Sequence, residues 1–304
     1  MDGVILPVVN QIIMLFLIAA IGLGLRLKGV FTDTVIKAIN TTVLNVTWPC
    51  MAIMTTQKDY NEQTLHGFLF VLAVSVVGMT VAYLVAWLLF FRNRSDCVRP
   101  ALINLSALPN AGFMGLPIVQ AVYGDVGVLY LAAFVVGFNI VLWTVGASMF
   151  TGFKAKSLKN LLSPGFISSI VGVVLFLARI RLPEALLSTV NQIGAMNTPL
   201  SMLLLGSRMD TLRLRHLADW RVWTAAGLKN LAMPLALCAV LRLCGVTGIL
   251  LAVPVMLMAM PPAAACQMLC ERHDADVALA ARTISVATLL SVATIPLVLL
   301  VCGG

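Results

Sequence analysis

The chain has 304 residues, of which 61% are hydrophobic and 11% are charged. Soluble domains average about 45–50% apolar and about 25% charged residues, so this composition excludes a sizeable soluble domain and indicates a polytopic membrane protein. The net charge of +8 would suit a nucleic-acid partner. The basic residues lie instead in short loops between apolar segments, where they set membrane topology, and we therefore expect no nucleic-acid partner.

A membrane-spanning helix needs about 20 mainly apolar residues. The first such run, Val4–Leu25, is too long for the apolar core of a signal peptide, so we expect a retained first span. In chain order the rule predicts ten spans, at residues 4–25, 34–55, 67–91, 98–123, 126–150, 161–179, 183–208, 221–244, 247–270 and 277–301. The loops between them are short. The expected fold class is therefore an all-α polytopic bundle embedded in a lipid bilayer.

The charges of the loops predict its orientation. Of the 20 Lys and Arg residues, 13 lie in odd-numbered loops and 4 in even-numbered loops. Basic residues accumulate on the cytoplasmic side of a membrane. We therefore expect a multi-pass protein of the cell inner (plasma) membrane, with both termini extracytoplasmic. Lys229 and Arg282 lie near span ends, and we expect their long side chains to extend towards the membrane surface.

The two halves of the chain, 1–150 and 151–304, resemble each other. Three pairs of landmarks recur at nearly one spacing: Trp48-Pro49 and Thr198-Pro199 at 150, Ala107–Ala111 and Ala259–Ala263 at 152, and Asp125 and Asp276 at 151 residues. Each half holds five predicted spans, and an odd number forces the second half to run through the membrane in the opposite direction. The pattern predicts two inverted five-helix repeats.

The predicted fourth and ninth spans are each interrupted by proline, which removes a backbone donor and clashes with the preceding turn. Broken helices survive in a membrane when they are buried in protein or line a wet cavity, and matching breaks in two halves indicate a transporter's binding site. Half-helix N-termini carry partial positive charge and free N–H groups that suit an anion, to which Asn110 adds an amide. A packing kink is the alternative. The candidate substrate-binding residues at the breaks are Pro109, Asn110, Ala111, Gly112, Pro261 and Pro262.

Four polar residues inside other spans are further candidates for substrate binding: Asn45, Asn139, Thr288 and Ser291. Asn45 ends a polar stripe with Lys37 and Thr41, and such stripes usually face the inside of a helix bundle. Asn139 and Ser291 are again 152 residues apart, with Thr288 one turn before Ser291. Hydrogen bonding between helices explains these side chains equally well.

The chain carries no enzyme or ATPase motif, so we expect no catalytic activity and no cofactor. Cys266, Cys270 and His273 have helical spacing but lack a fourth ligand, and we expect no metal site. Asp125 and Asp276 each follow a loop and are expected to cap the next helix. No buried titratable group is evident at the breaks, which favours facilitated movement driven by the membrane potential.

The stretch Asn104–Gly124 contains Leu-Pro-Asn followed by Met-Gly-Leu-Pro, and it resembles the fourth-helix signature of the auxin efflux carrier family. That family includes plant PIN auxin exporters and bacterial organic-acid permeases. The similarity continues in Pro199–Gly206, Ala259–Ala263 and Ser291–Pro296, so it covers essentially the whole chain. The short basic stretch 151–160 resembles the bacterial branch.

This resemblance implies helices 4 and 9 that cross at their breaks, a fold of the NhaA and bile-acid-transporter type. It implies a scaffold of helices 1, 2, 6 and 7, a transport domain of helices 3–5 and 8–10, a homodimer joined through the scaffold, and an elevator-like motion. Pro109 and Asn110 match the family's Pro-Asn pair, where a substrate carboxylate is held. Pro261 matches the ninth-helix proline, whereas Pro262 departs from the small or polar residue often found there.

The leading functional hypothesis is a secondary transporter of a small organic anion, a carboxylate of the malonate or malate type. A sodium-coupled symporter of bile-acid-transporter type is one alternative, and an anion channel is another. A receptor that binds the ligand without flux is a further possibility.

Overall fold

The computed structural model describes residues 2–57, 62–93, 95–152, 164–209 and 219–302. Within these ranges the regular structure is helical, with one isolated backbone bridge and no strand, which confirms the expected all-α class. Several basic residues on which the predicted orientation depends lie outside the described ranges, as does most of the basic stretch 151–160: Lys58, Arg94, Lys154, Lys156, Lys159, Arg213 and Arg215.

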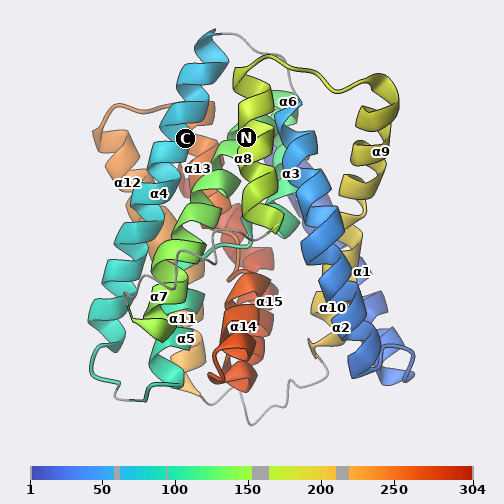
Figure 1. Ribbon diagram of the computed structural model, residues 1–304. Helices are drawn as coiled ribbons and strands as arrows, with labels where there is room; N and C mark the ends of the chain where they lie inside the picture. Colours follow the sequence, from blue (N-terminus) through green and yellow to red (C-terminus); the bar gives the residue numbers. More distant parts are fainter. Residues whose placement is uncertain (1, 58–61, 94, 153–163, 210–218, 303–304) are drawn as a thin grey trace.

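The helices follow one another with short connections. The first half of the chain forms α1 (Asp2–Leu27), α2 (Asp33–Thr42), η1 (Val43–Thr47), α3 (Trp48–Thr56), α4 (Glu62–Phe90), α5 (Val98–Ala107), η2 (Ala111–Gly115), α6 (Leu116–Val141), η3 (Leu142–Gly146) and α7 (Ala147–Thr151). The second half forms α8 (Pro164–Leu177), α9 (Glu184–Ala195), α10 (Asn197–Ser207), α11 (Trp220–Gly227), η7 (Leu228–Ala232), α12 (Met233–Leu243), α13 (Ile249–Met258), α14 (Ala264–Arg272) and α15 (Val277–Cys302). The elements labelled η are single wide π-helical turns. Figure 1 shows how the α-helices are arranged in the bundle.

Proline explains where three of these wide turns occur. The turns η1, η2 and η7 each end two residues before a proline, namely Pro49, Pro117 and Pro234. Because proline has no N–H and its ring collides with the carbonyl four residues earlier, the helix opens by one residue at that point. The turn η2 belongs to the first predicted break, so the same chemistry shapes the break and its surroundings.

The helices coincide within a few residues with the predicted apolar segments. At Gly124 the backbone takes φ 57° and ψ −148°, which divides α6 where the fourth predicted segment ends and the fifth begins. Among the described residues, four stretches are long and apolar enough to cross a membrane by themselves: Thr64–Phe90, Ala111–Thr151, Trp220–Leu243 and Val277–Cys302. These helices support a membrane-embedded protein.

Two pairs of loops are joined by hydrogen bonds, and within each pair the predicted loop numbers have the same parity. At one end, the amide of Asp276 donates to the carbonyl of Cys97 at 3.3 Å, which joins the loops before α15 and α5. At the other end, the Gln57 side chain accepts a hydrogen bond from the Leu182 amide at 3.0 Å. Asp276 also accepts from the Leu279 amide at 2.9 Å, which confirms its predicted role as the cap of α15.

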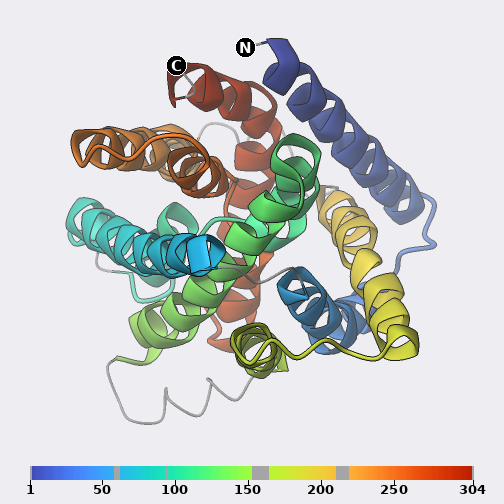
Figure 2. The same cartoon turned by 90° about the horizontal axis from the view of Figure 1, so that it is seen from above.

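Two groups of helices are visible in the view from above (Figure 2). The first group, α1–α3 with α8–α10, packs mainly through α1 against α10 and through α3 against α8 and α9. The second group comprises α4–α7 and α11–α15, with α4 against α6 and α11 against α15. The helix α6 lies where the groups meet and contacts α1, α3 and α8.

Glycine allows the backbones of α1 and α10 to touch. A methyl group on Gly22 would overlap the main chain of Leu203, and one on Gly206 would overlap the main chain of Ala19. Small residues at such positions are typical of helix pairs in membranes, where close van der Waals contact replaces the hydrophobic effect. This contact holds the first helix group together.

Candidate functional site

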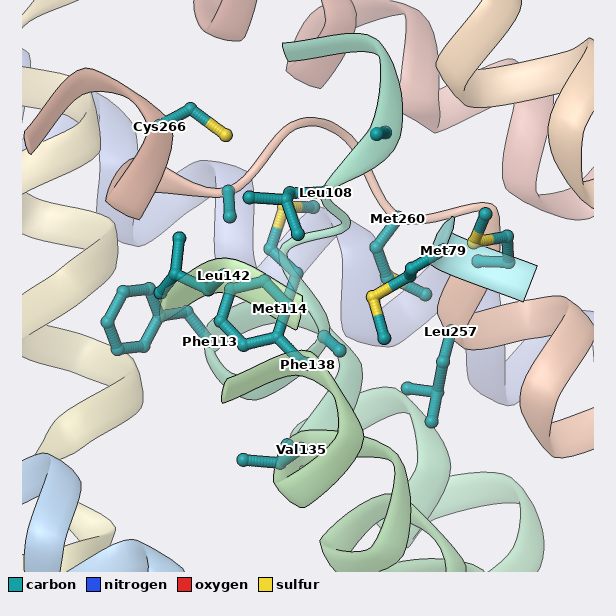
Figure 3. Close-up of a cluster of buried hydrophobic side chains, with 14 of the residues drawn as sticks. Met79, Leu108, Phe113, Met114, Val135, Phe138, Leu142, Leu257, Met260 and Cys266 are labelled. Carbon is teal, nitrogen blue, oxygen red and sulfur yellow. The ribbon is translucent and has the colours of Figure 1, made fainter. Parts of the chain in front are cut away.

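The two proline breaks meet in the centre of the structure. Pro109 and Pro262 form an antiparallel bridge, the amide of Asn110 donates to the carbonyl of Pro261 at 2.7 Å, and the amide of Ala263 donates to the carbonyl of Leu108 at 3.0 Å. Each segment thus supplies the backbone partners that the other lost, which removes the main cost of unwinding two helices in an apolar environment. Figure 3 shows the segments passing each other near Leu108 and Met260.

Four helix ends converge on this crossing. The helices α5 and α13 end there at Ala107 and Met258, while η2 and α14 begin there after Asn110 and Ala263. Neither N-terminus is capped by the side chain of its N-cap residue. The crossing therefore presents two positive helix ends with N–H groups that a bound anion can use.

A cavity of about 200 Å³ borders the start of α14. Its walls include the amides of Asn45 and Asn139, the rings of Trp48 and Trp143, and Ala264 in the first turn of α14. Within the described part of the chain, the Nε1–H of Trp48 is buried and has no hydrogen-bond acceptor. An apolar cavity with a few convergent polar groups is typical of a small-molecule site, and a buried donor without an acceptor in a residue of its wall is a further polar group to be explained.

Gly112 sets the position of that indole. The Trp48 ring packs edge-on against Phe113, with centroids 4.8 Å apart. A methyl group on Gly112 would come within 2.9 Å of the same indole. The second residue after Asn110 is therefore a glycine because the indole occupies the space of a side chain. In the sequence, Trp48 stood out only because Trp48-Pro49 has a counterpart in the second half of the chain. No sequence pattern predicted that its indole N–H would lack an acceptor.

Asn110 borders a smaller chamber of about 40 Å³, between the crossing, α10 and α15. Its side chain is 5% exposed. Phe113, Ala264 and Met268 line both this chamber and the larger cavity, so the two are neighbours. The predicted amides therefore divide between two adjoining spaces that share the first turn of α14 as a wall.

A sequence profile of the family described as "Membrane transport protein" matches residues 7–160 and 153–299. The chain is 23% identical over 295 residues to an uncharacterized transporter of Methanothermobacter thermautotrophicus, covering 95% of this chain and 96% of the relative. It is 23% identical over 305 residues to the uncharacterized transporter YfdV of Escherichia coli K12, with the same coverage. The chain belongs to the membrane transport protein family. The resemblance to auxin efflux carriers is thereby confirmed, as is the expectation of a transporter in place of an enzyme.

In this membrane transport protein, the hydroxyl groups of two candidate residues are engaged within their own helix. Thr288 and Ser291 are buried in α15, and their hydroxyl groups donate to the carbonyls of Ile284 at 2.7 Å and Thr288 at 2.6 Å. Neither residue lines the cavities described above. Their environment fits the alternative of helix packing. Pro109, Ala111, Gly112, Pro261 and Pro262 form the backbone of the crossing itself.

Lys229 corrects an expectation from the sequence. Its side chain is fully buried, and its Nζ donates to the carbonyl of Met258, the last residue of α13. It does not extend towards the membrane surface, because the negative end of the broken helix provides a partner inside the protein. The expectation that no titratable group lies buried at the crossing is also wrong. Hydropathy does not distinguish a lysine that is buried inside the protein from one whose side chain reaches the membrane surface, because both lie in an apolar helix.

A buried polar cluster braces the crossing from the side of α4. The Tyr83 hydroxyl donates to Oδ1 of Asn104 at 2.7 Å, and Nδ2 of Asn104 donates to the carbonyl of Pro100 at 2.9 Å. The thiol of Cys266 donates to the Asn104 carbonyl at 3.4 Å, so α14 is tied to α5 just beyond the breaks. His273, which has helical spacing to Cys266 and Cys270 in the sequence, stacks on Phe150 with ring centroids 5.2 Å apart.

Proposed function

We propose that this membrane transport protein is a secondary transporter of a small organic anion, a carboxylate of the malonate or malate type. The observation that carries the proposal is the crossing of the two breaks, whose half-helix N-termini adjoin cavities lined by amide groups and by Trp48, whose buried indole N–H has no acceptor. Carboxylates are bound well by backbone N–H groups, amides and indole N–H, all of which donate hydrogen bonds.

The walls of the larger cavity favour an anion over a cation. None of the residues that line it in the described part of the chain is acidic, and its polar groups are amides and N–H donors. A sodium ion needs several oxygen ligands, commonly carboxylates, whereas an anion needs donors. This composition supports the organic-anion hypothesis over the sodium-coupled symporter of bile-acid-transporter type.

The size of the chamber beside Asn110 favours a carrier over an anion channel. At about 40 Å³ it has room for a few water molecules at most, and no dicarboxylate fits. A channel requires a continuous path in its conducting state, whereas a carrier keeps one side closed. We therefore infer that the protein works by alternating access. A continuous conductance that does not saturate with substrate concentration would favour the channel instead.

The proposed architecture is ten membrane spans in two inverted repeats, 1–150 and 151–304. Contacts between residues about 150 positions apart support it: the Thr47 hydroxyl donates to Oδ1 of Asn197 at 3.0 Å, and Asn110 pairs with Pro261. Equivalent residues of inverted repeats meet near their shared axis. The proposed topology places both termini outside the inner (plasma) membrane and the odd-numbered loops in the cytoplasm.

The proposed motion is elevator-like, with the first helix group as the scaffold and the second as the transport domain. The glycine contact of α1 with α10 supports a rigid scaffold, and we propose that two copies join through it as a homodimer. Lys229 belongs to the second group, so a buried positive charge would move together with the anion. The buried Lys229 replaces the expectation of a site without titratable groups.

The test is uptake of radiolabelled malonate and malate into liposomes that contain the purified protein. Asn110→Ala and Trp48→Phe each remove a donor, and we expect each to lower saturable uptake about tenfold or more, because a hydrogen bond to a charged group contributes roughly 1.5–3 kcal/mol. Ser291→Ala is the matched control, since it removes a buried hydroxyl that donates within its own helix and lines neither cavity. Equal uptake by all four proteins would place the site elsewhere. Uptake that requires sodium would favour the symporter.

A further inference from the structure

A third cavity opens at the end of the bundle where α1, α10 and α14 end. Its volume is about 680 Å³, and we call it the basic vestibule because four of its lining residues are basic and two are acidic. The basic residues are Arg26, Lys37, Arg208 and Arg282, and the acidic residues are Asp33 and Glu271. Its charge attracts anions to this end of the protein.

The basic vestibule adjoins the candidate site. Asn40, Arg208, Gln267 and Glu271 line both the vestibule and the chamber that contains Asn110. That chamber in turn shares the first turn of α14 with the cavity of Asn45 and Asn139. The three spaces therefore adjoin one another between the end of the bundle and the crossing, and Asn40 lines all three.

An ion pair stands between the vestibule and the chamber. The Nη1 of Arg208, which follows α10, lies 3.0 Å from Oε1 of Glu271 in the last turn of α14. The same carboxylate oxygen accepts from Nε2 of Gln267 at 3.0 Å. The pair joins the first helix group to the second, and its side chains are 25% and 42% exposed. It is thus accessible to an anion that arrives from the vestibule.

We propose that Arg208 determines specificity for dicarboxylates by exchanging the Glu271 carboxylate for the second carboxylate of the substrate. This inference rests on the proposed function, since it assumes that the first carboxylate is held at the crossing. Arg208 and Asn110 line the same chamber, so one substrate that spans an enlarged chamber reaches both. The guanidinium group binds carboxylates in a planar, two-point geometry, and Gln267 remains as a partner for the released Glu271.

A purely mechanical role for the ion pair makes a different prediction. If Arg208 and Glu271 only held the two helix groups together, loss of either partner would change the transport of every substrate by the same factor. The specificity role predicts changes of opposite sign in the two variants. Arg208→Gln removes the group that binds the second carboxylate, whereas Glu271→Gln removes its competitor.

The experiment measures kcat/KM for malonate and for the monocarboxylate propionate in liposomes. We expect the ratio of malonate to propionate to fall about tenfold or more in Arg208→Gln, and to rise several-fold in Glu271→Gln. Arg282→Gln removes the same charge from the vestibule but does not line the chamber, so it should leave the ratio unchanged. A ratio that is unchanged in both Arg208→Gln and Glu271→Gln would overturn the proposal.

Calorimetric titration of the detergent-purified proteins with malonate separates this inference from the proposed function. If the wild-type protein binds malonate without transporting it, the proposed function fails. The Kd of the variants then still decides the role of Arg208: weaker binding by Arg208→Gln with tighter binding by Glu271→Gln supports it. No binding of malonate by the wild-type protein, or equal Kd values in all proteins, refutes it. Thermal unfolding of each variant verifies that it is folded.

Discussion

Lys229 is fully buried beside the carbonyl end of α13, and it donates a hydrogen bond to Met258, three residues before Pro261, which pairs with Asn110. The described residues provide no salt bridge to this ammonium group. Its charge is instead opposed by the partial negative charge at the end of a helix. When Lys229 is protonated, the transport domain that carries a monoanion is closer to electroneutral.

Two substitutions of Lys229 separate its hydrogen bond from its charge. Lys229→Met leaves the Met258 carbonyl without a donor, and we expect it to lower the free energy of unfolding by about 1–3 kcal/mol. Lys229→Gln keeps a donor and should cost less. Both remove the ionisable group, so if Lys229 crosses the membrane protonated, the dependence of uptake on an imposed potassium diffusion potential should shift by up to about one elementary charge, or ~2.3 kcal/mol per 100 mV. The same potential dependence in all three proteins would show that Lys229 does not carry charge across the membrane.

At the scale of the helix, proline and glycine have different structural roles: proline interrupts helices, and glycine allows two helices to pack closely. Proline opens the π-helical turns η1, η2 and η7 and interrupts the two crossing segments, so it exposes backbone groups near the cavities. Glycine permits the close contact of α1 with α10. The first helix group is therefore held by packing of backbones, and the crossing by hydrogen bonds between backbones.

Glycine substitutions in these helices should have unequal effects. Gly206→Ala places a methyl group against the carbonyl of Ala19, which forces α10 away from α1, and we expect a loss of about 1–3 kcal/mol of stability. Gly24→Ala is the matched control in α1, since no heavy atom lies within 4 Å of the added methyl group. Thermal unfolding of the purified variants measures both. A similar melting temperature for the two would contradict the proposed role of the contact.

At the scale of the whole molecule, native cysteines report the proposed topology. Cys97 and Cys244 are both exposed, and they lie in loops of opposite parity. The topology places Cys97 in the cytoplasm and Cys244 outside. A membrane-impermeant maleimide should therefore label Cys244 in intact cells or spheroplasts, and Cys97 only after permeabilisation.

The variants Cys97→Ser and Cys244→Ser show which of the two cysteines carries the label. Cys238, Cys266, Cys270 and Cys302 are buried and should react slowly in the folded protein. Labelling of Cys97 in intact cells would reverse the orientation. Labelling of both cysteines in intact cells would place these loops on the same side and refute the alternation of spans between them.

The sequence by itself predicted the helical class, the apolar segments, the two breaks and the family. These features depend on local chemistry, because hydropathy, proline and a short motif act on the residues nearest to them. The same reasoning predicted Asn45, Asn110 and Asn139 as candidates, since polar groups in apolar helices need partners. It misjudged Lys229, and the hydroxyl groups of Thr288 and Ser291 are occupied within their own helix.

Only the tertiary structure decided which of these groups meet. The pairing of Asn110 with Pro261 and the ion pair of Arg208 with Glu271 each join segments that are far apart in the chain. The lack of an acceptor for the N–H of Trp48 likewise depends on which side chains surround it. Periodicity and composition report which face of a helix is polar, but they do not report which helix lies opposite. Burial of a charge beside a helix end, or of a donor without an acceptor, is a property of that arrangement in space.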